Sequence, residues 1–187
     1  MEPEGKQLVE AAQRGDRAAA VALIEMFYAR IYAFLRRLAP SEEDAADLNQ
    51  KTFSEAWRAL PGFAGRSSVS SWLHGIAYHI YIDWRRAQRP TEYRPDEWWH
   101  SQPSFAQRPD ELAATSDLRS VLYKSVETLD EELRLTVHLH YFEGLTLEET
   151  AETMKVATST VKYRVRQAIS ALQGRLSPTN GPKPVFS

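Results

Sequence analysis

The sequence predicts an all-α protein made of two small helical domains joined by a flexible linker. Three observations lead to this prediction. Apolar residues recur at steps of three and four, the spacing of an amphipathic helix, both before residue 88 and after residue 111. No stretch shows the alternation of polar and apolar residues that is typical of a strand. Residues 88–111 contain four prolines and few aliphatic side chains, which indicates an extended connection.

The expected boundaries follow from these patterns. We predict a first domain over residues 1–89, a linker over 90–111, a second domain over 112–176 and a disordered tail over 177–187. A chain of 187 residues fits one domain or two small ones.

Composition excludes several classes of protein. The chain has no cysteine, so a disulfide framework, a thiolate zinc site and a cysteine nucleophile are all excluded. The acidic, polar N-terminus is unlike a signal peptide, and no apolar run approaches the roughly 18 residues needed to span a bilayer. We therefore expect a cytoplasmic protein that does not insert into a membrane and that needs no metal or other cofactor.

The first two helices of the first domain are read from periodicity. A short helix over residues 6–14 is expected to end near Gly15, and a long helix over 17–38 to stop at Pro40. The long helix carries an apolar stripe that is expected to be core: Ile24, Phe27, Tyr28, Ile31, Leu35 and Leu38.

Two further helices complete the first domain. Ser41 and Asp44 form a capping-box-like start, in which side chains satisfy free N–H groups, for a helix that runs to about Leu60. After a loop, the fourth helix spans residues 69–87. On this helix Trp72 and Asp83 fall on the buried stripe, so we expect Trp72 to be core and Asp83 to be structural, because a buried acid needs a partner.

The second domain shows a helix-turn-helix pattern. A helix over 130–141 carries Leu133, Val137 and Tyr141 on one side, and Gly144 suits the turn that follows. A capping box formed by Thr146 and Glu149 starts a short helix. It runs to about Met154, and a third helix follows over residues 159–172. Its expected buried face is Val161, Val165, Ala168 and Leu172.

Charge is distributed unevenly, although the net charge is only −2. Residues 51–89 hold six Lys/Arg against two Asp/Glu, and residues 155–175 hold five Lys/Arg and no acid. Residues 90–132 hold four Lys/Arg and ten Asp/Glu, a net charge of −6. The basic segments are candidates for phosphate contacts. The acidic segment either shields them or is a solvated linker.

The third helix of the second domain fits a recognition helix in the DNA major groove. Small polar and basic side chains lie outside its apolar stripe, where they can meet base edges and phosphates: Ser159, Thr160, Lys162, Tyr163, Arg166 and Gln167. The alternative is a plain three-helix bundle with a solvated basic face. The lack of any acid over 155–175 favours DNA binding.

Two neighbouring helices of the first domain differ in chemistry. The helix from Ser41 presents acids and an amide suited to a protein partner: Asp44, Asp47 and Gln50. The helix after it presents aromatic and basic side chains that can take up unstacked bases and phosphates: Tyr78, Tyr81, Arg85 and Arg86.

Three segments in this order resemble the extracytoplasmic-function (ECF) sigma factors. They are DAADLNQKTF (44–53), WLHGIAYHIYIDWRR (72–86) and GLTLEETAETMKVATSTVKYRVRQA (144–168). The resemblance implies that Asp44, Asp47 and Gln50 bind the clamp helices of the largest subunit of core RNA polymerase, while Leu48 and Phe53 are core. It implies that the second segment opens the minus-ten element and that the third reads the minus thirty-five element beside the flap of the second-largest subunit. An anti-sigma partner is also implied.

The resemblance and the helix-face patterns together give the candidate site residues of both DNA-binding segments. For the minus-ten element they are Tyr78, His79, Tyr81, Arg85 and Arg86, and for the minus thirty-five element Ser159, Thr160, Lys162, Tyr163 and Arg166.

The chain departs from the family pattern at several positions. His79 stands where the family usually has Asn, and it is either a base-reading residue with different hydrogen bonding or a histidine at the edge of the core. Lys51 replaces an acid, Lys155 replaces a turn glycine, which costs strain if its φ is positive, and Ala157 replaces a capping serine.

Two other functions compete with the sigma-factor interpretation. A conventional helix-turn-helix regulator that acts without polymerase accounts for residues 112–176 but not for the acidic and aromatic helices of the first domain. An enzyme is disfavoured because the histidines diverge on their helices and no phosphate loop, nucleophile elbow or HExxH pattern is present in the sequence.

Overall fold

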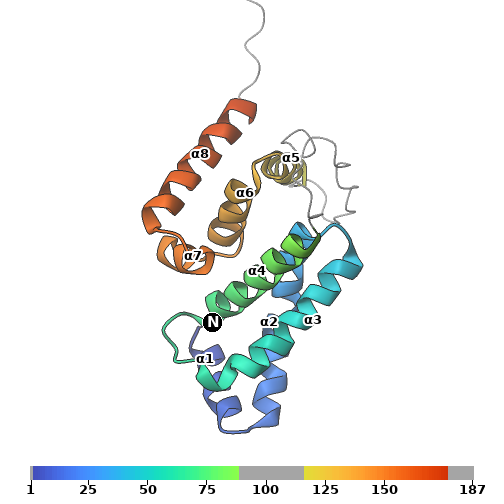
Figure 1. Cartoon of the computed structure of the whole chain (residues 1–187), viewed down its shortest axis with the longest axis vertical. Coiled ribbons are helices and arrows are strands. Elements are labelled where there is room, and N and C mark those ends of the chain that lie inside the picture. Colours follow the sequence, from blue (N-terminus) through green and yellow to red (C-terminus); the bar gives the residue numbers. More distant parts are fainter. Residues whose placement is uncertain (1, 89–115, 177–187) are drawn as a thin grey trace, which may run out of the picture. The chain divides into compact units, whose positions relative to one another are not determined.

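The computed structural model describes residues 2–88 and 116–176, and the side chains of residues 5–88 and 122–173. Every element in these ranges is helical, which confirms the predicted all-α class with two helical regions (Figure 1). The chain divides into two compact units, which are described separately. The predicted linker, with Trp98 and Trp99, and the predicted tail lie outside the described residues, so the domain boundaries stay predictions.

The first unit contains α1 (Glu2–Gln13), α2 (Arg17–Leu38), α3 (Glu42–Ala59), the 3-10 turn η1 (Leu60–Gly62) and α4 (Val69–Gln88). These bounds agree with the predicted helices except that α1 begins four residues earlier than expected. Asp16 caps α2, since its carboxylate accepts the N–H groups of Ala18 at 2.9 Å and Ala19 at 3.2 Å. Gly15, with a φ of 93°, supplies the left-handed turn before this cap.

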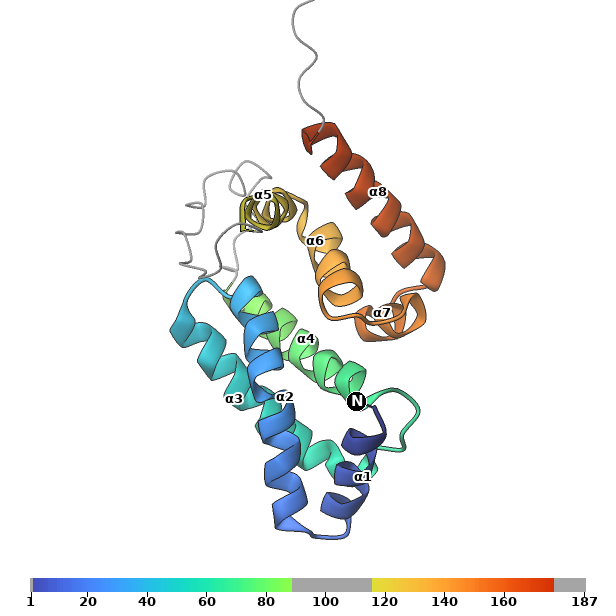
Figure 2. The ribbon, with the colours of Figure 1, turned by 180° about the vertical axis from the view of Figure 1, so that it is seen from behind.

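Helix α2 is the centre of the first unit. It packs against α1, α3 and α4 (Figure 2). Ile31, Phe34 and Leu35 of α2 are completely buried, as are Leu48 of α3 and Ala77 of α4. Of the predicted stripe, Tyr28 is 47% exposed, so it does not belong to the core.

Helix α2 also meets the length and composition of a membrane span. Its 22 residues include an 18-residue window with a mean hydropathy of 1.6. The expectation from the sequence that no segment approaches the length and hydropathy of a membrane span overlooked this helix. Core helices of soluble proteins pass the same criterion, and α2 packs on three other helices of its unit.

The second unit contains α5 (Ser116–Glu127), α6 (Glu131–Val137), the π-helical turn η3 (His138–Phe142), α7 (Leu147–Met154) and α8 (Thr158–Leu176). One cluster of its apolar core is formed by Val126, Leu129, Val137 and Ala168, with Leu133, Phe142, Ala171 and Leu172 packed against them. Helices α6 and α7 both contact α8 (Figure 1).

The π turn corrects one sequence-based prediction. A continuous α-helix over 130–141 would place Tyr141 in line with Leu133 and Val137, yet Tyr141 is 55% exposed. A π turn takes one more residue than an α turn. Phe142 therefore takes the inward position and stacks on Tyr123 with a ring-centroid distance of 4.9 Å.

Candidate functional site

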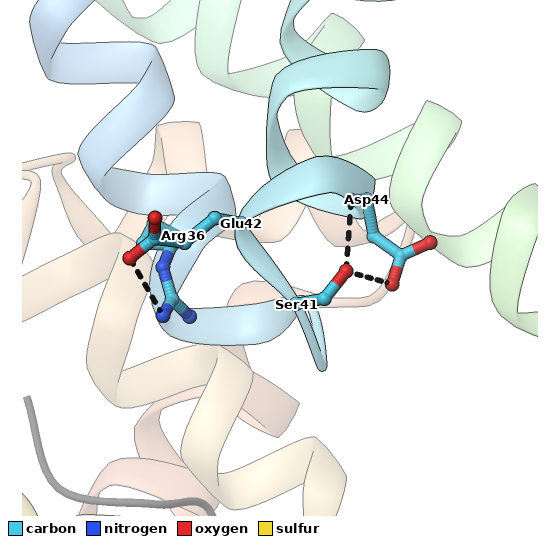
Figure 3. Close-up of polar contacts among 4 residues, drawn as sticks. All are labelled: Arg36, Ser41, Glu42 and Asp44. Atoms are coloured by element: carbon cyan, nitrogen blue, oxygen red, sulfur yellow. Dashed lines mark hydrogen bonds and ion pairs between the residues drawn. The ribbon is translucent and has the colours of Figure 1, made fainter.

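The start of α3 is fixed by a cap that engages Asp44. The backbone N–H of Asp44 donates to the hydroxyl oxygen of Ser41 at 3.0 Å, and that hydroxyl donates to the Asp44 carboxylate at 2.5 Å (Figure 3). The predicted cap by Ser41 is thereby confirmed, whereas the Asp44 carboxylate accepts the Ser41 hydroxyl and not a backbone N–H as a capping box would require. Arg36 of α2 pairs with Glu42 at 3.3 Å and joins the end of α2 to the start of α3.

Asp47 and Gln50 project from the solvent side of α3. Both are exposed, whereas Ala45, Leu48 and Thr52 on the opposite side are buried. Asp44 is half buried because it takes part in the cap. Leu48 is core as expected, but Phe53 is only half buried and stacks on the exposed Tyr28 with centroids 5.6 Å apart.

Trp57 extends this surface, and the sequence reasoning overlooked it. It lies one turn after Phe53 and its side chain is 52% exposed. A signal was present in the sequence, since Trp57 falls outside the buried positions 45, 48, 52 and 56 of α3. Lys51 is exposed on the same helix, where the family pattern has an acid.

Two predicted DNA contacts of α4 are buried. Tyr78 is 9% exposed and Tyr81 only 1%, so the expectation that both rings stand out from α4 is wrong. The reason is that α4 packs against α1, α2 and α3, which buries a wider face than one apolar stripe. Tyr81 stacks on Trp84 with centroids 6.1 Å apart.

The exposed side of α4 carries the other predicted residues. Arg86 is exposed, while His79 and Arg85 are half buried. The His79 ring lies edge-on to Tyr78 at 5.3 Å, at the margin of the core. Asp83 was expected to face the buried stripe, but its side chain is 77% exposed and pairs with Arg86 at 3.7 Å.

A structured loop precedes α4. Trp72 was expected to be core; it is half buried, and its ring lies 4.7 Å from that of Phe63 in the loop. Ser68 caps α4, because its hydroxyl oxygen accepts the N–H of Ser71 at 2.9 Å.

The helix-turn-helix of the second unit is held by a complete capping box. The Thr146 hydroxyl oxygen accepts the Glu149 N–H at 3.1 Å, and the Glu149 carboxylate accepts the Thr146 N–H at 2.9 Å. Lys155 has a φ of 54° and a ψ of 44°, the left-handed conformation that the family's glycine would adopt without strain. The predicted capping box is therefore confirmed, and the condition under which Lys155 costs strain, a positive φ, is met.

Helix α8 buries one face and exposes another. Val161 and Ala168 are buried and Val165 and Leu172 are half buried. All five predicted contact residues are accessible: Ser159, Lys162, Tyr163 and Arg166 are exposed and Thr160 is half buried. Arg164 differs from them, since it lies on the inner side and forms an ion pair with Glu132 of α6.

Two family matches cover these structures. Residues 23–91 match the family described as Sigma-70 region 2, and residues 126–174 match Sigma-70 region 4. The ECF RNA polymerase sigma-E factor of Escherichia coli K12 is 31% identical over 179 residues, which cover 91% of this chain and 93% of that protein. The chain belongs to the ECF sigma factor family. The RNA polymerase sigma-H factor of Pseudomonas aeruginosa PAO1 is 28% identical over 183 residues, 94% of this chain and 95% of the relative.

Solved structures share the fold. The structure of CnrH in complex with the cytosolic domain of CnrY matches with a TM-score of 0.67 and 20% identity, over 95% of this chain and 99% of that one. The sigma factor RpoE from Bartonella quintana, solved with the anti-sigma factor NepR, matches with a TM-score of 0.62 and 24% identity, over 84% of this chain and 96% of that one.

Family membership settles the class of function. As an ECF sigma factor the chain is a promoter-recognition subunit of RNA polymerase and not an enzyme. A regulator that acts without polymerase is set aside, because the region 2 match spans most of α2 and all of α3 and α4, which such a regulator would leave unexplained.

Proposed function

We propose that α3 is the main attachment to core RNA polymerase. Asp47 and Gln50 would contact the clamp helices of the largest subunit, with Asp44 beside them at the capped end of the helix. The observation that carries this proposal is the exposure of Asp47 and Gln50 on a helix whose opposite face is locked into the core. A surface fixed before docking loses little side-chain and backbone freedom on binding.

Strand opening is assigned to the exposed side of α4. Arg85 and Arg86 would hold the phosphates of the displaced strand, and His79 would meet an unstacked base at the margin of the core. The buried Tyr78 and Tyr81 are left out of this proposal and are assigned the task of fixing α4 in its unit.

Duplex recognition is assigned to α8. Ser159, Thr160 and Lys162 lie in its first turns, where a recognition helix meets base edges, and Tyr163 and Arg166 extend the same accessible surface. Arg164 would not contact DNA, because its side chain is only 14% exposed and is paired with Glu132 of α6. The second unit would sit beside the flap of the second-largest subunit.

An anti-sigma protein is the proposed regulator. CnrH and RpoE were both solved with partner proteins, CnrY and NepR, and the RpoE partner is an anti-sigma factor. The site of action would be the cytoplasm, where core polymerase and promoter DNA are found.

The assignment is tested by promoter-specific transcription in vitro. Core RNA polymerase with the wild-type chain would first select a promoter from random-sequence DNA, and run-off transcription would then be compared between variants. Asp47→Ala with Gln50→Ala should remove transcription by loss of core binding, whereas Arg85→Ala with Arg86→Ala should remove it with core binding intact. The matched control is Gln7→Ala with Glu10→Ala, an exposed amide and acid three residues apart on α1. Normal transcription by the Asp47/Gln50 variant would contradict the role of α3, and normal transcription by the Arg85/Arg86 variant would contradict the role of α4.

A further inference from the structure

The loop between α3 and α4 is held by a side chain from α1. The Nε2 amide group of Gln13 donates one hydrogen bond to the carbonyl oxygen of Leu60 and one to that of Phe63, both at 2.9 Å. Carbonyl oxygens only accept, so the nitrogen and not the oxygen of the Gln13 amide must face them. Both N–H donors of the Gln13 amide therefore bind the loop, at residues 47 and 50 positions further along the chain.

Phe63 connects this loop to α4. Its N–H donates to the carbonyl oxygen of Leu60 at 3.1 Å, and its ring rests on Trp72 with centroids 4.7 Å apart. Gly65, with a φ of 67°, makes the turn that follows, and the Ser68 hydroxyl then caps α4. The loop is therefore fixed at its start by Gln13, in its middle by Trp72 and at its end by the cap.

Trp72 lies at the head of the exposed side of α4. Trp72, His79 and Arg86 are spaced by seven residues, or two helical turns, so they share one side of the helix. Phe63 and Trp72 are both half buried, which leaves part of each ring open, whereas Tyr78 and Tyr81 point inward. The Phe63–Trp72 pair and the loop thus continue the surface assigned to promoter opening.

We propose that Gln13 is a positioning residue for promoter opening. By fixing the carbonyl groups of the first residue of the η1 turn and of the residue just after it, Gln13 sets where Phe63 meets Trp72 and so shapes one end of the α4 surface. This inference rests on the proposed role of α4. Without the two hydrogen bonds the start of the loop is released and Phe63 shifts against Trp72, while Asp47 and Gln50, two to four turns away on α3, keep their places.

The test compares Gln13→Met with Gln7→Met in the full chain bound to core RNA polymerase. Methionine matches glutamine in length and helix propensity but has no donor. Gln7 is exposed on the same helix and serves as the matched control. The measurements are affinity for core polymerase, the thermal unfolding midpoint, and permanganate reactivity of thymines in the opened strand of a promoter selected by the wild-type holoenzyme.

Gln13→Met should lower the yield of opened complexes about fivefold, the equivalent of one net hydrogen bond of about 1 kcal/mol. Core affinity should stay at the wild-type value, the unfolding midpoint should fall only slightly because two hydrogen bonds are lost, and Gln7→Met should behave as wild type in all three measurements. Normal opening by Gln13→Met, an equal loss in Gln7→Met, a parallel loss of core affinity, or a fall in the unfolding midpoint that leaves the chain partly unfolded at the assay temperature would each overturn the inference.

Failure of the inference is distinguishable from failure of the proposed function. Arg85→Ala with Arg86→Ala, measured in the same assay, reports on α4 itself. If this variant opens poorly while Gln13→Met opens normally, only the positioning role is wrong. If the Arg85/Arg86 variant opens normally, the role of α4 is wrong and the inference falls with it.

Discussion

The side chain of Tyr81 lies inside the first unit, with 1% of its surface exposed, and stacks on Trp84. A buried ring of this size holds α4 against its neighbours and is not available to a DNA base. A mutational defect at this position therefore reports on folding before it reports on promoter contact.

Tyr81→Ala should lower the free energy of unfolding by about 3–5 kcal/mol, the usual cost of removing a buried aromatic ring. Denaturant unfolding followed by circular dichroism measures this. The matched comparison is Arg86→Ala on the exposed side of the same helix, which should change stability by less than about 0.5 kcal/mol. Equal stability of the two variants would show that Tyr81 is not a core residue.

Lys155 carries strain that a glycine would remove. Its φ of 54° places a side chain in the left-handed region, at a cost of about 1 kcal/mol. Lys155→Gly should therefore raise the free energy of unfolding of the second unit by up to about 1 kcal/mol. Glu152→Gly, at an exposed position inside α7, should lower it by about the same amount. Thermal unfolding that moved in the same direction for both variants would contradict this account.

At the scale of elements, the capping box at the start of α7 orients the helix that supports α8. Thr146→Ala removes the hydroxyl that accepts the Glu149 N–H and should cost about 1 kcal/mol of stability. Glu148→Ala, exposed in the same first turn, is the control and should be close to neutral. The free energy of unfolding of the full chain is measured for both variants. Equal values for Thr146→Ala and Glu148→Ala would mean that the cap adds nothing to stability.

Helix α8 is expected to bind phosphates through its exposed cations. Each phosphate contact contributes about one unit to the slope of log K against log salt, so Lys162→Ala should reduce that slope for minus thirty-five duplex binding by about one. Lys124→Ala, an exposed lysine on α5, should leave the slope unchanged. Fluorescence anisotropy over a salt series measures both, and an unchanged slope for Lys162→Ala would remove this residue from the interface.

Sequence periodicity predicted the helices well where one face is buried. The bounds of α2 and the caps at Ser41 and Thr146 follow from spacing and local hydrogen bonding, which the sequence encodes directly. The predicted exposure of Tyr78 and Tyr81 was wrong because α4 packs against three helices. The periodicity of a single helix does not contain this tertiary information.

Two other features needed the structure itself. The π turn at His138–Phe142 changes the register of the helix by one residue and so exchanges Tyr141 for Phe142 in the core. The hydrogen bonds from Gln13 to the loop join residues 47 and 50 positions apart, so no local sequence pattern predicts them. Exposed Asp47 and Gln50, in contrast, were predictable because they sit opposite a clear buried stripe on α3.

At the scale of the whole molecule, we propose that the functions are divided between two helical units. In the first, α3 would contact a protein partner through acids and an amide, and α4 would contact opened DNA through basic side chains. In the second, α8 would contact duplex DNA through polar and basic side chains. The central claim of this account is that binding to core polymerase through α3 comes first, because the opening surface of α4 acts only when the polymerase holds the DNA beside it.

Equilibrium binding of the fluorescently labelled full chain to bacterial core RNA polymerase tests that claim most directly. The account predicts tight binding by wild type and by the Gln7→Ala with Glu10→Ala control. Asp47→Ala with Gln50→Ala should weaken binding by at least tenfold, about 1.4 kcal/mol, without a change in unfolding midpoint. Binding by the Asp47/Gln50 variant that matches wild type would contradict the account and move the polymerase contact away from α3.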